Sequence, residues 1–414
     1  MTALRSARSG FAGRVGGSLV GALGATVTIA VAGVFSSRLL GPAGKGEASV
    51  ALVGATSAAV LVMGGRDLWI ATDVSRRGWN TAAASTARRC TGLAAALLVV
   101  GVGAGLLVGG RTGVAIAGAA VAAAGTALLQ IGVAVVSGLR RPKTLAVSNG
   151  GGGLAVLVLT LVLVAADRPS VGLVVAAVGG GRALGAVWAA FATRGDRSTP
   201  VVDDHIDTAA IGRFGRPAAV GTALTLGINR LDTVLVAILL GATKAGIYAV
   251  ASAITELMWV IPDAVALVLA PEVAASPSFS RSAKAVRLTC LLVLAGGAVA
   301  AVSAPWVVPR VFGEGFDGAA PAVIPLSLAA VALGAWKLVV ADLAGRGLTA
   351  VRPRTIGAGL VAMLGADLAL VPAFGIVGAG VGSVVGYGVA LALALRAWVG
   401  AGGTLRLLAG GSEA

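Results

Sequence analysis

Apolar residues run along this chain in long stretches, and short polar segments interrupt them repeatedly. A helix of about 20 apolar residues is long enough to cross the ~30 Å hydrocarbon core of a bilayer. The pattern therefore predicts an all-α polytopic membrane protein with about twelve transmembrane helices. The predicted spans are 15–36, 47–65, 91–110, 113–137, 145–166, 170–192, 214–240, 245–270, 288–309, 319–344, 355–373 and 375–398.

The longest polar break lies near the middle of the chain and divides the spans into two sets of six. We therefore predict an N-terminal six-helix bundle over 1–193, a cytoplasmic linker over 194–212 and a C-terminal six-helix bundle over 213–414. Leu-Leu-Gly at 39–41 recurs at 239–241, and the pattern from Gln130 to Gly138 resembles the pattern from Lys337 to Gly345. These matches have the same order in both halves, so they indicate a six-plus-six duplication.

Composition and charge agree with this topology. The chain is 57% apolar and 12% charged, with a mean hydropathy of +0.96, which is far too apolar for a soluble domain. Of its 32 Lys and Arg residues, three lie inside spans and most others lie in segments that are cytoplasmic if the N-terminus is cytoplasmic. Six fall in the outside segments, namely Arg38, Lys45, Arg111, Arg168, Lys244 and Arg310.

This distribution follows the positive-inside rule and predicts that both termini are cytoplasmic. The localisation that we predict is the bacterial cytoplasmic (plasma) membrane. The net charge of +15 is then a consequence of topology, and we predict no nucleic-acid partner. We also predict no metal and no cofactor, because Cys90 and Cys290 match no metal or redox spacing. His205 is the one histidine of the chain, which leaves no plausible Ser/His/Asp set, and we expect a protein that is not an enzyme.

Charged residues inside spans are costly in lipid and usually line a bundle interior or a wet cavity. Arg230, Arg182 and Lys337 are the candidate substrate-binding residues, because Arg grips phosphate by paired hydrogen bonds and Lys acts as a point charge. The structural alternative is that each pairs with an acidic side chain of a neighbouring helix. Asp232, Asp342 and Asp367 are candidates either for ion coupling or for such charge pairing.

Several segments resemble the bacterial polysaccharide-biosynthesis flippases, the O-antigen and teichoic-acid exporters of the multidrug/oligosaccharidyl-lipid/polysaccharide (MOP) superfamily. The resemblance lies in SRLLGPAGKG (37–46), INRLDTVLVAILLG (228–241) with AGIYAVA (245–251), VFGEGF (311–316), GRG (345–347) and VPAFGIVGA (371–379). It implies the inverted-V, two-bundle fold of that superfamily and a lipid-linked sugar as cargo. Cationic cavity residues are implied as well, and Arg230, Arg182 and Lys337 occupy suitable positions.

We therefore predict an alternating-access flippase that moves a polyprenyl-(pyro)phosphate-linked oligosaccharide from the inner to the outer leaflet for surface polysaccharide biosynthesis. Its partners would be the lipid-linked sugar, membrane lipids, and glycosyltransferases or a polymerase of the same surface-glycan pathway. The alternatives are a drug/cation antiporter of the same superfamily, a lipid II flippase, a polytopic glycosyltransferase or polymerase, and a noncatalytic scaffold.

Overall fold

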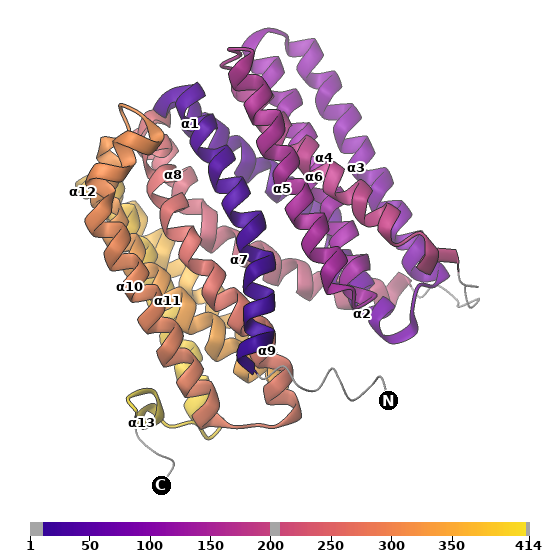
Figure 1. Ribbon diagram of the computed structural model, residues 1–414, viewed down its shortest axis with the longest axis vertical. Helices are drawn as coiled ribbons and strands as arrows, with labels where there is room; N and C mark the ends of the chain where they lie inside the picture. The colour runs from indigo at the N-terminus through magenta and orange to yellow at the C-terminus, as the bar shows by residue number, and fades with distance from the viewer. Residues whose placement is uncertain (1–10, 199–207, 411–414) are drawn as a thin grey trace. The chain divides into compact units, whose positions relative to one another are not determined.

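The structure is a computed structural model that describes residues 11–198 and 208–410, and these residues are almost entirely helical. Figure 1 shows the arrangement of the helices. The α-helices are α1 (Phe11–Met63), α2 (Arg66–Arg77), α3 (Thr81–Val108), α4 (Gly110–Gly138), α5 (Pro142–Ala165), α6 (Val171–Ala192), α7 (Thr208–Leu240), α8 (Ala242–Glu256), α9 (Val260–Ala275), α10 (Phe279–Phe312), α11 (Ala320–Gly345), α12 (Val351–Gly400) and α13 (Leu405–Leu408). Short 3-10 turns are η2 (Gly195–Ser198), η3 (Leu257–Trp259) and η4 (Asp317–Ala319).

Two of the helices each contain two spans. The described residues hold ten helical segments long and apolar enough to cross a membrane. Within α1, Gly41 has φ 64° and ψ −179°, and within α12, Gly375 has φ 61° and ψ −141°. The α1 chain reverses at its kink, since Lys45 Nζ returns to within 3.5 Å of the Gly33 carbonyl oxygen. Counting both arms of α1 and α12 gives twelve spans and confirms the predicted all-α polytopic fold.

Contacts divide the described chain into two compact units. Unit 2 comprises residues 24–198 and 208–226, and unit 1 comprises residues 11–23 and 227–410. The division falls inside α7, and residues 199–207 of the predicted linker lie outside the described part of the chain. The predicted bundle limits of 1–193 and 213–414 therefore remain a prediction.

In unit 2, α4 is the central helix. It packs against α2, α3, α5 and α6 (Figure 1), and 67% of its most apolar window is buried. Glycines allow α4 and α6 to approach closely, because a Cβ on Gly118 would overlap the Gly172 carbonyl and a Cβ on Gly125 would overlap the Gly179 carbonyl. Such small-residue contacts hold helices together in lipid, where the hydrophobic effect gives no drive for helix association.

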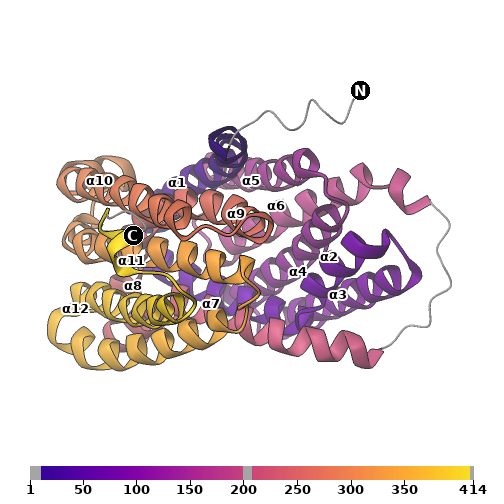
Figure 2. The same cartoon turned by 90° about the horizontal axis from the view of Figure 1, so that it is seen from below.

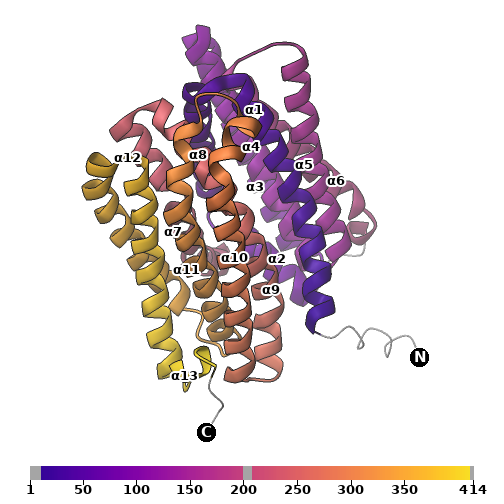
Figure 3. The same cartoon turned by 60° about the vertical axis from the view of Figure 1, so that its left-hand side comes forward.

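In unit 1, α11 holds the corresponding place. It packs against α8, α9, α10 and α12, and the view in Figure 2 shows it between α10 and α12. Its most apolar window is also 67% buried. The two arms of α12 lie side by side (Figure 3), because Gly378, Gly382 and Gly386 face Leu370, Asp367 and Met363 with no room for a Cβ.

Details of the two units support the duplication. Gly41 and Gly241 occupy matching sequence positions, and both have positive φ with extended ψ, at 64° and −179° and at 85° and 169°. At the ends of the two central helices, Gly138 lies against Val74, and Gly345 lies against Val273 in the same way. The echo between residues 130–138 and 337–345 therefore corresponds to equivalent places in the two units.

Helix α2 lies in a segment for which the hydrophobic pattern predicted only a polar connection. It is strongly amphipathic, with Ile70 and Val74 buried. Asp67 in its first turn and Arg76 and Arg77 in its last turn complement the helix dipole. The helix is too short to span a bilayer, and it brings a carboxylate to the end of α4.

Candidate functional site

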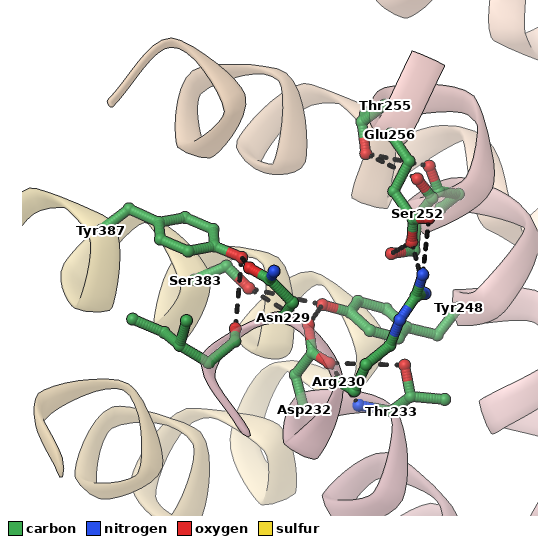
Figure 4. Close-up of polar contacts among 12 residues, drawn as sticks. Asn229, Arg230, Asp232, Thr233, Tyr248, Ser252, Thr255, Glu256, Ser383 and Tyr387 are labelled. Atoms are coloured by element: carbon green, nitrogen blue, oxygen red, sulfur yellow. Dashed lines mark hydrogen bonds and ion pairs between the residues drawn. The ribbon is translucent and has the colours of Figure 1, made fainter. Parts of the chain in front are cut away.

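Asp232 is the centre of a buried polar network in unit 1 that joins α7, α8 and α12 (Figure 4). It is 4% exposed. Its Oδ2 accepts hydrogen bonds from the Tyr248 hydroxyl at 2.6 Å and from the Ser383 hydroxyl at 3.4 Å. Its Oδ1 accepts from the backbone N–H of Thr233 at 2.6 Å. These donors provide several hydrogen bonds to a carboxylate inside the membrane.

Arg230 precedes Asp232 by two residues, so the two side chains point to different sides of α7. The Arg230 guanidinium forms a two-pronged ion pair with Glu256 at the end of α8, with N–O distances of 2.6 and 2.8 Å. The Ser252 hydroxyl also donates to Glu256 at 3.1 Å. Arg230 was predicted as a substrate-binding residue, and the structure places it in the alternative arrangement, paired with an acid of a neighbouring helix (Figure 4).

A second tyrosine closes the network from the second arm of α12. The Tyr387 hydroxyl lies 3.2 Å from the Ile228 carbonyl oxygen and 3.0 Å from Asn229 Oδ1. The polar groups here enclose a cavity of only about 10 Å³, which is the space of a single water-sized sphere. The interior of unit 1 around Asp232 is therefore nearly filled by its own side chains.

Asp367, on the first arm of α12, is fully buried. Neither carboxylate oxygen has a hydrogen-bond partner among the described residues. Oδ1 lies against Gly382, where a Cβ would overlap it. On the second arm of α12, Gly382 thus contacts Asp367, and the next residue, Ser383, is hydrogen-bonded to Asp232. An unpaired carboxylate is costly in this setting, so this arrangement suits binding of a proton or a small cation.

The other two candidates in unit 1 are paired. Lys337 Nζ lies 2.7 Å from Asp263 Oδ1 and 5.3 Å from the centre of the Trp259 ring. Asp342 is fully buried and accepts hydrogen bonds from Ser282, Trp398 and Arg346. Asp342 is therefore ion-paired with Arg346, and its role in ion coupling or charge pairing remains a prediction.

Unit 2 contains a much larger cavity, of about 450 Å³. Arg182 of α6 lies in its wall and donates to the Thr126 hydroxyl of α4 at 2.6 Å. The cavity has polar and apolar lining residues. They are Thr56, Asp67, Leu68, Ala71, Thr126, Leu129, Gln130, Val133, Ala134, Ser137 and Arg182. Arg182, one of the three cationic residues predicted to bind substrate, therefore lies in the wall of a cavity of ligand size.

Asp67 brings the opposite charge to the same cavity. Burial raises the pKa of its carboxyl above the ordinary value of 3.8, and the backbone N–H of Leu68 offsets part of this effect. The Gln130 side chain also lines the cavity, and its buried Oε1 has no partner among the described residues. The wall therefore offers a guanidinium and a carboxylate to a polar ligand.

The hydrophobic pattern missed Asp67, Glu256 and Asp263. Glu256 and Asp263 fall within the predicted span 245–270, so they carried the same signal as Arg230 and Lys337. A cation inside a span usually pairs with an acid or faces a cavity, so counting acids as well as bases in each span would have identified both residues as candidate partners. Asp67 carried no such signal, because it lies outside every predicted span.

Comparison with solved structures identifies the architecture. An inward-facing multidrug resistance MATE family transporter of the MOP superfamily aligns with a TM-score of 0.71 and 17% identity, covering 93% of this chain and 95% of its own. The chain has the MOP-type transporter fold. The lipid II flippase MurJ in its inward closed conformation aligns with a TM-score of 0.71 and 10% identity, over 93% of this chain and 88% of its own.

A Vibrio cholerae MATE transporter aligns on the same MOP-type fold with a TM-score of 0.65 and 17% identity, over 94% of this chain and 97% of its own. The sequence matches no family profile and no curated protein. At these identities the likeness defines the fold alone. The protein is thus a multi-pass membrane protein built like transporters and flippases, and its cargo has to be argued from its own residues.

Proposed function

We propose that this protein is an alternating-access flippase that moves a polyprenyl-(pyro)phosphate-linked oligosaccharide from the inner to the outer leaflet of a bacterial plasma membrane. The observation that carries the proposal is the position of Arg182 in the wall of the 450 Å³ cavity of unit 2. A half-buried guanidinium in a cavity wall, at predicted membrane depth, suits a phosphate group. The threonine, serine and glutamine side chains of the same wall suit sugar hydroxyls.

Arg182 is the primary phosphate contact in this proposal. Arg230 and Lys337 are secondary contacts, because each already has a carboxylate partner, Glu256 or Asp263, that a phosphate would have to displace. No bond of the cargo is made or broken, so the protein acts as a carrier rather than an enzyme.

Unit 1 supplies the coupling site in this proposal. Three ion pairs in its described part match Arg230, Lys337 and Arg346 with one acid each. Asp232 and Asp367 form no ion pair in the described chain and remain as excess negative charge in the membrane. A proton or small cation that binds there would neutralise this charge, and its release would restore it. A downhill flux of that ion could then drive the cycle.

The test is replacement of Arg182 by Ala in cells that depend on this protein for their surface glycan. We expect lipid-linked sugar to accumulate on the cytoplasmic leaflet and surface glycan to fall, while the amount of protein in the membrane is unchanged. Arg168→Ala is the matched control, because Arg168 is an exposed arginine in the connection between α5 and α6. Normal surface glycan without accumulation in the Arg182 variant would refute the proposal.

The drug/cation antiporter is the second candidate, and the excess acids of unit 1 favour it. An antiporter of organic cations needs such acids more than it needs Arg182. Efflux of a cationic dye that is lost in Asp367→Asn and retained in Arg182→Ala would select this candidate. Depletion of this protein from cells tests the third candidate, a lipid II flippase. Loss of a lipid II flippase stops cell-wall growth and lyses the cell.

A further inference from the structure

The cavity of unit 2 follows one face of α4. Four of its lining residues, Thr126, Gln130, Val133 and Ser137, are spaced by four, three and four positions, which places them on one side of a helix. The first and last are about 16 Å apart along the axis at 1.5 Å per residue. The cavity is therefore a slot that runs from mid-membrane to the predicted cytoplasmic end of α4, with Arg182 at its deep end.

Asp67 occupies a defined level along this slot. Before it in the sequence, Met63 packs in one apolar cluster with Ile131 of α4. After it, Ile70 packs in the next cluster with Ala134. The chain from Met63 to Ile70 thus runs in the same direction as α4, and Asp67 lies level with the stretch between Ile131 and Ala134.

This level lies five to eight residues beyond Thr126, the hydrogen-bond partner of Arg182. At 1.5 Å per residue, the Asp67 backbone is about 10 Å closer to the predicted cytoplasmic end than the Arg182 site. The slot therefore has separate positive and negative positions along its length. The Gln130 side chain lines the slot between these two positions.

We propose that Asp67 selects a cargo that carries a protonated amine as well as a phosphate, such as a lipid-linked glycan with an unacetylated amino sugar. The inference rests on the proposed function, because it assumes that Arg182 binds the phosphate of the cargo. The phosphate occupies the deep end of the slot, and the sugar extends toward the cytoplasmic end with its ammonium group against Asp67. A neutral sugar would desolvate the half-buried Asp67 carboxylate without giving it a cationic partner, which is unfavourable.

The chemistry of the slot agrees with this assignment. Burial raises the pKa of the Asp67 carboxyl, so the environment disfavours an isolated carboxylate, and an incoming ammonium would relieve this penalty. A slot for a purely anionic glycan would not gain from a carboxylate in its wall, because like charges repel in a region of low dielectric.

The test uses purified full-length protein in lipid nanodiscs and two soluble probes, glucosamine 6-phosphate and glucose 6-phosphate. These probes differ by an ammonium in place of a hydroxyl. We expect the wild type to bind the amine probe roughly tenfold more tightly, as one charge-assisted hydrogen bond would provide. Asp67→Asn should abolish this preference, while Asp167→Asn, which changes an exposed acid outside the slot, should retain it.

The outcomes separate the two proposals. If Asp67→Asn strengthens binding of both probes equally, the acid is only a counter-charge for Arg182, and the inference of an amine-bearing cargo is wrong. An unchanged ratio of affinities also overturns it. If Arg182→Gln leaves the binding of both phosphates unchanged, the proposed phosphate site itself fails, whatever Asp67 does. Retention of the wild-type elution volume on size exclusion shows that each variant is folded.

Discussion

The buried carboxylate of Asp342 provides a sharp test of charge pairing in unit 1. This residue of α11 is fully buried and joins the ends of three helices, because it accepts from Ser282 of α10, from Trp398 of α12 and from Arg346 just after α11. The Trp398 bond is 2.9 Å, and the Arg346 Nε bond is 2.8 Å. The same guanidinium lies 3.4 Å from the centre of the Phe279 ring, which fixes its position.

The expected cost of removing this carboxylate can be worked out from these contacts. Loss of one partner of a buried ion pair costs about 3–5 kcal/mol, because the other charge remains buried and unpaired. Arg346 is 14% exposed, so it can turn only partly toward solvent. The Trp398 and Ser282 donors lose their acceptor as well, at about 1–3 kcal/mol each. Since some of these groups will find water, we expect Asp342→Ala to lower the free energy of unfolding by about 4 kcal/mol.

Asp342→Asn should cost less, about 2 kcal/mol, because its amide oxygen can still accept from Trp398 or Ser282. The assay is unfolding of the purified protein in mixed detergent micelles, with exposed Glu314→Ala as the control. The double variant Asp342→Ala with Arg346→Ala should lose less than the sum of the two single losses, by about 1–3 kcal/mol. If Asp342→Asn abolished transport at unchanged stability, Asp342 would be a coupling group and this reasoning would be refuted.

Three further predictions test other parts of the structure. Because burial raises the pKa of Asp67, the folded state keeps this proton to a higher pH than the unfolded chain, and stability falls as pH rises above 3.8 through the folded-state pKa. Asp67→Asn should therefore be more stable than the wild type at pH 7, and thermal melts should show this difference vanish as the pH approaches 4. Gly382→Ala should destabilise the α12 hairpin, because its Cβ would overlap Asp367 Oδ1, whereas Gly388→Ala has open space and should be tolerated; equal melting temperatures for the two variants would contradict the packing. Glu256→Gln should lower the melting temperature, and adding Arg230→Gln to this variant should then cost little more. If the losses of the two single variants simply add in the double variant, the ion pair contributes nothing to stability.

The hydrophobic pattern was sufficient to predict the membrane-spanning helices, because lipid forces every spanning segment to satisfy its backbone within itself. The spans are local, so a window of about 20 residues finds them. The kink at Gly375 also falls at the predicted break between 373 and 375. Helix α2 could not be found in this way, since its apolar side is only Ile70, Val74 and a few neighbours on a polar segment.

The charge partners could not be predicted from the pattern, because they depend on which helices are neighbours. Arg230 and Glu256 are separated by 26 residues, and the sequence alone does not tell which side of α8 faces α7. The same holds for Lys337 and Asp263. Arg182 and Arg230 were both selected for their predicted depth in the membrane. In the structure, Arg230 is paired with the carboxylate of Glu256, whereas Arg182 lies in the wall of the unit 2 cavity.

The duplication allows the residues that line the cavity of unit 2 to be compared with the residues at matching positions in unit 1. The repeat of Leu-Leu-Gly at 39–41 and 239–241 sets a shift of 200 positions for the first two spans of each half, so Glu256 corresponds to Thr56. The echo between 130–138 and 337–345 sets a shift of 207 for the fourth spans, so Lys337 corresponds to Gln130. At both places unit 1 has a charged side chain of an ion pair, and unit 2 has a smaller or uncharged one.

Thr56 and Gln130 both line the 450 Å³ cavity, whereas their counterparts Glu256 and Lys337 each form an ion pair in unit 1. The ion pairs of unit 1 therefore occupy the kind of space that unit 2 leaves open. Two copies of one bundle have then diverged in opposite directions, one toward excess carboxylates in a filled interior and the other toward an arginine in an open slot. This divergence agrees with the proposed division of labour, in which unit 1 couples to an ion and unit 2 binds the cargo.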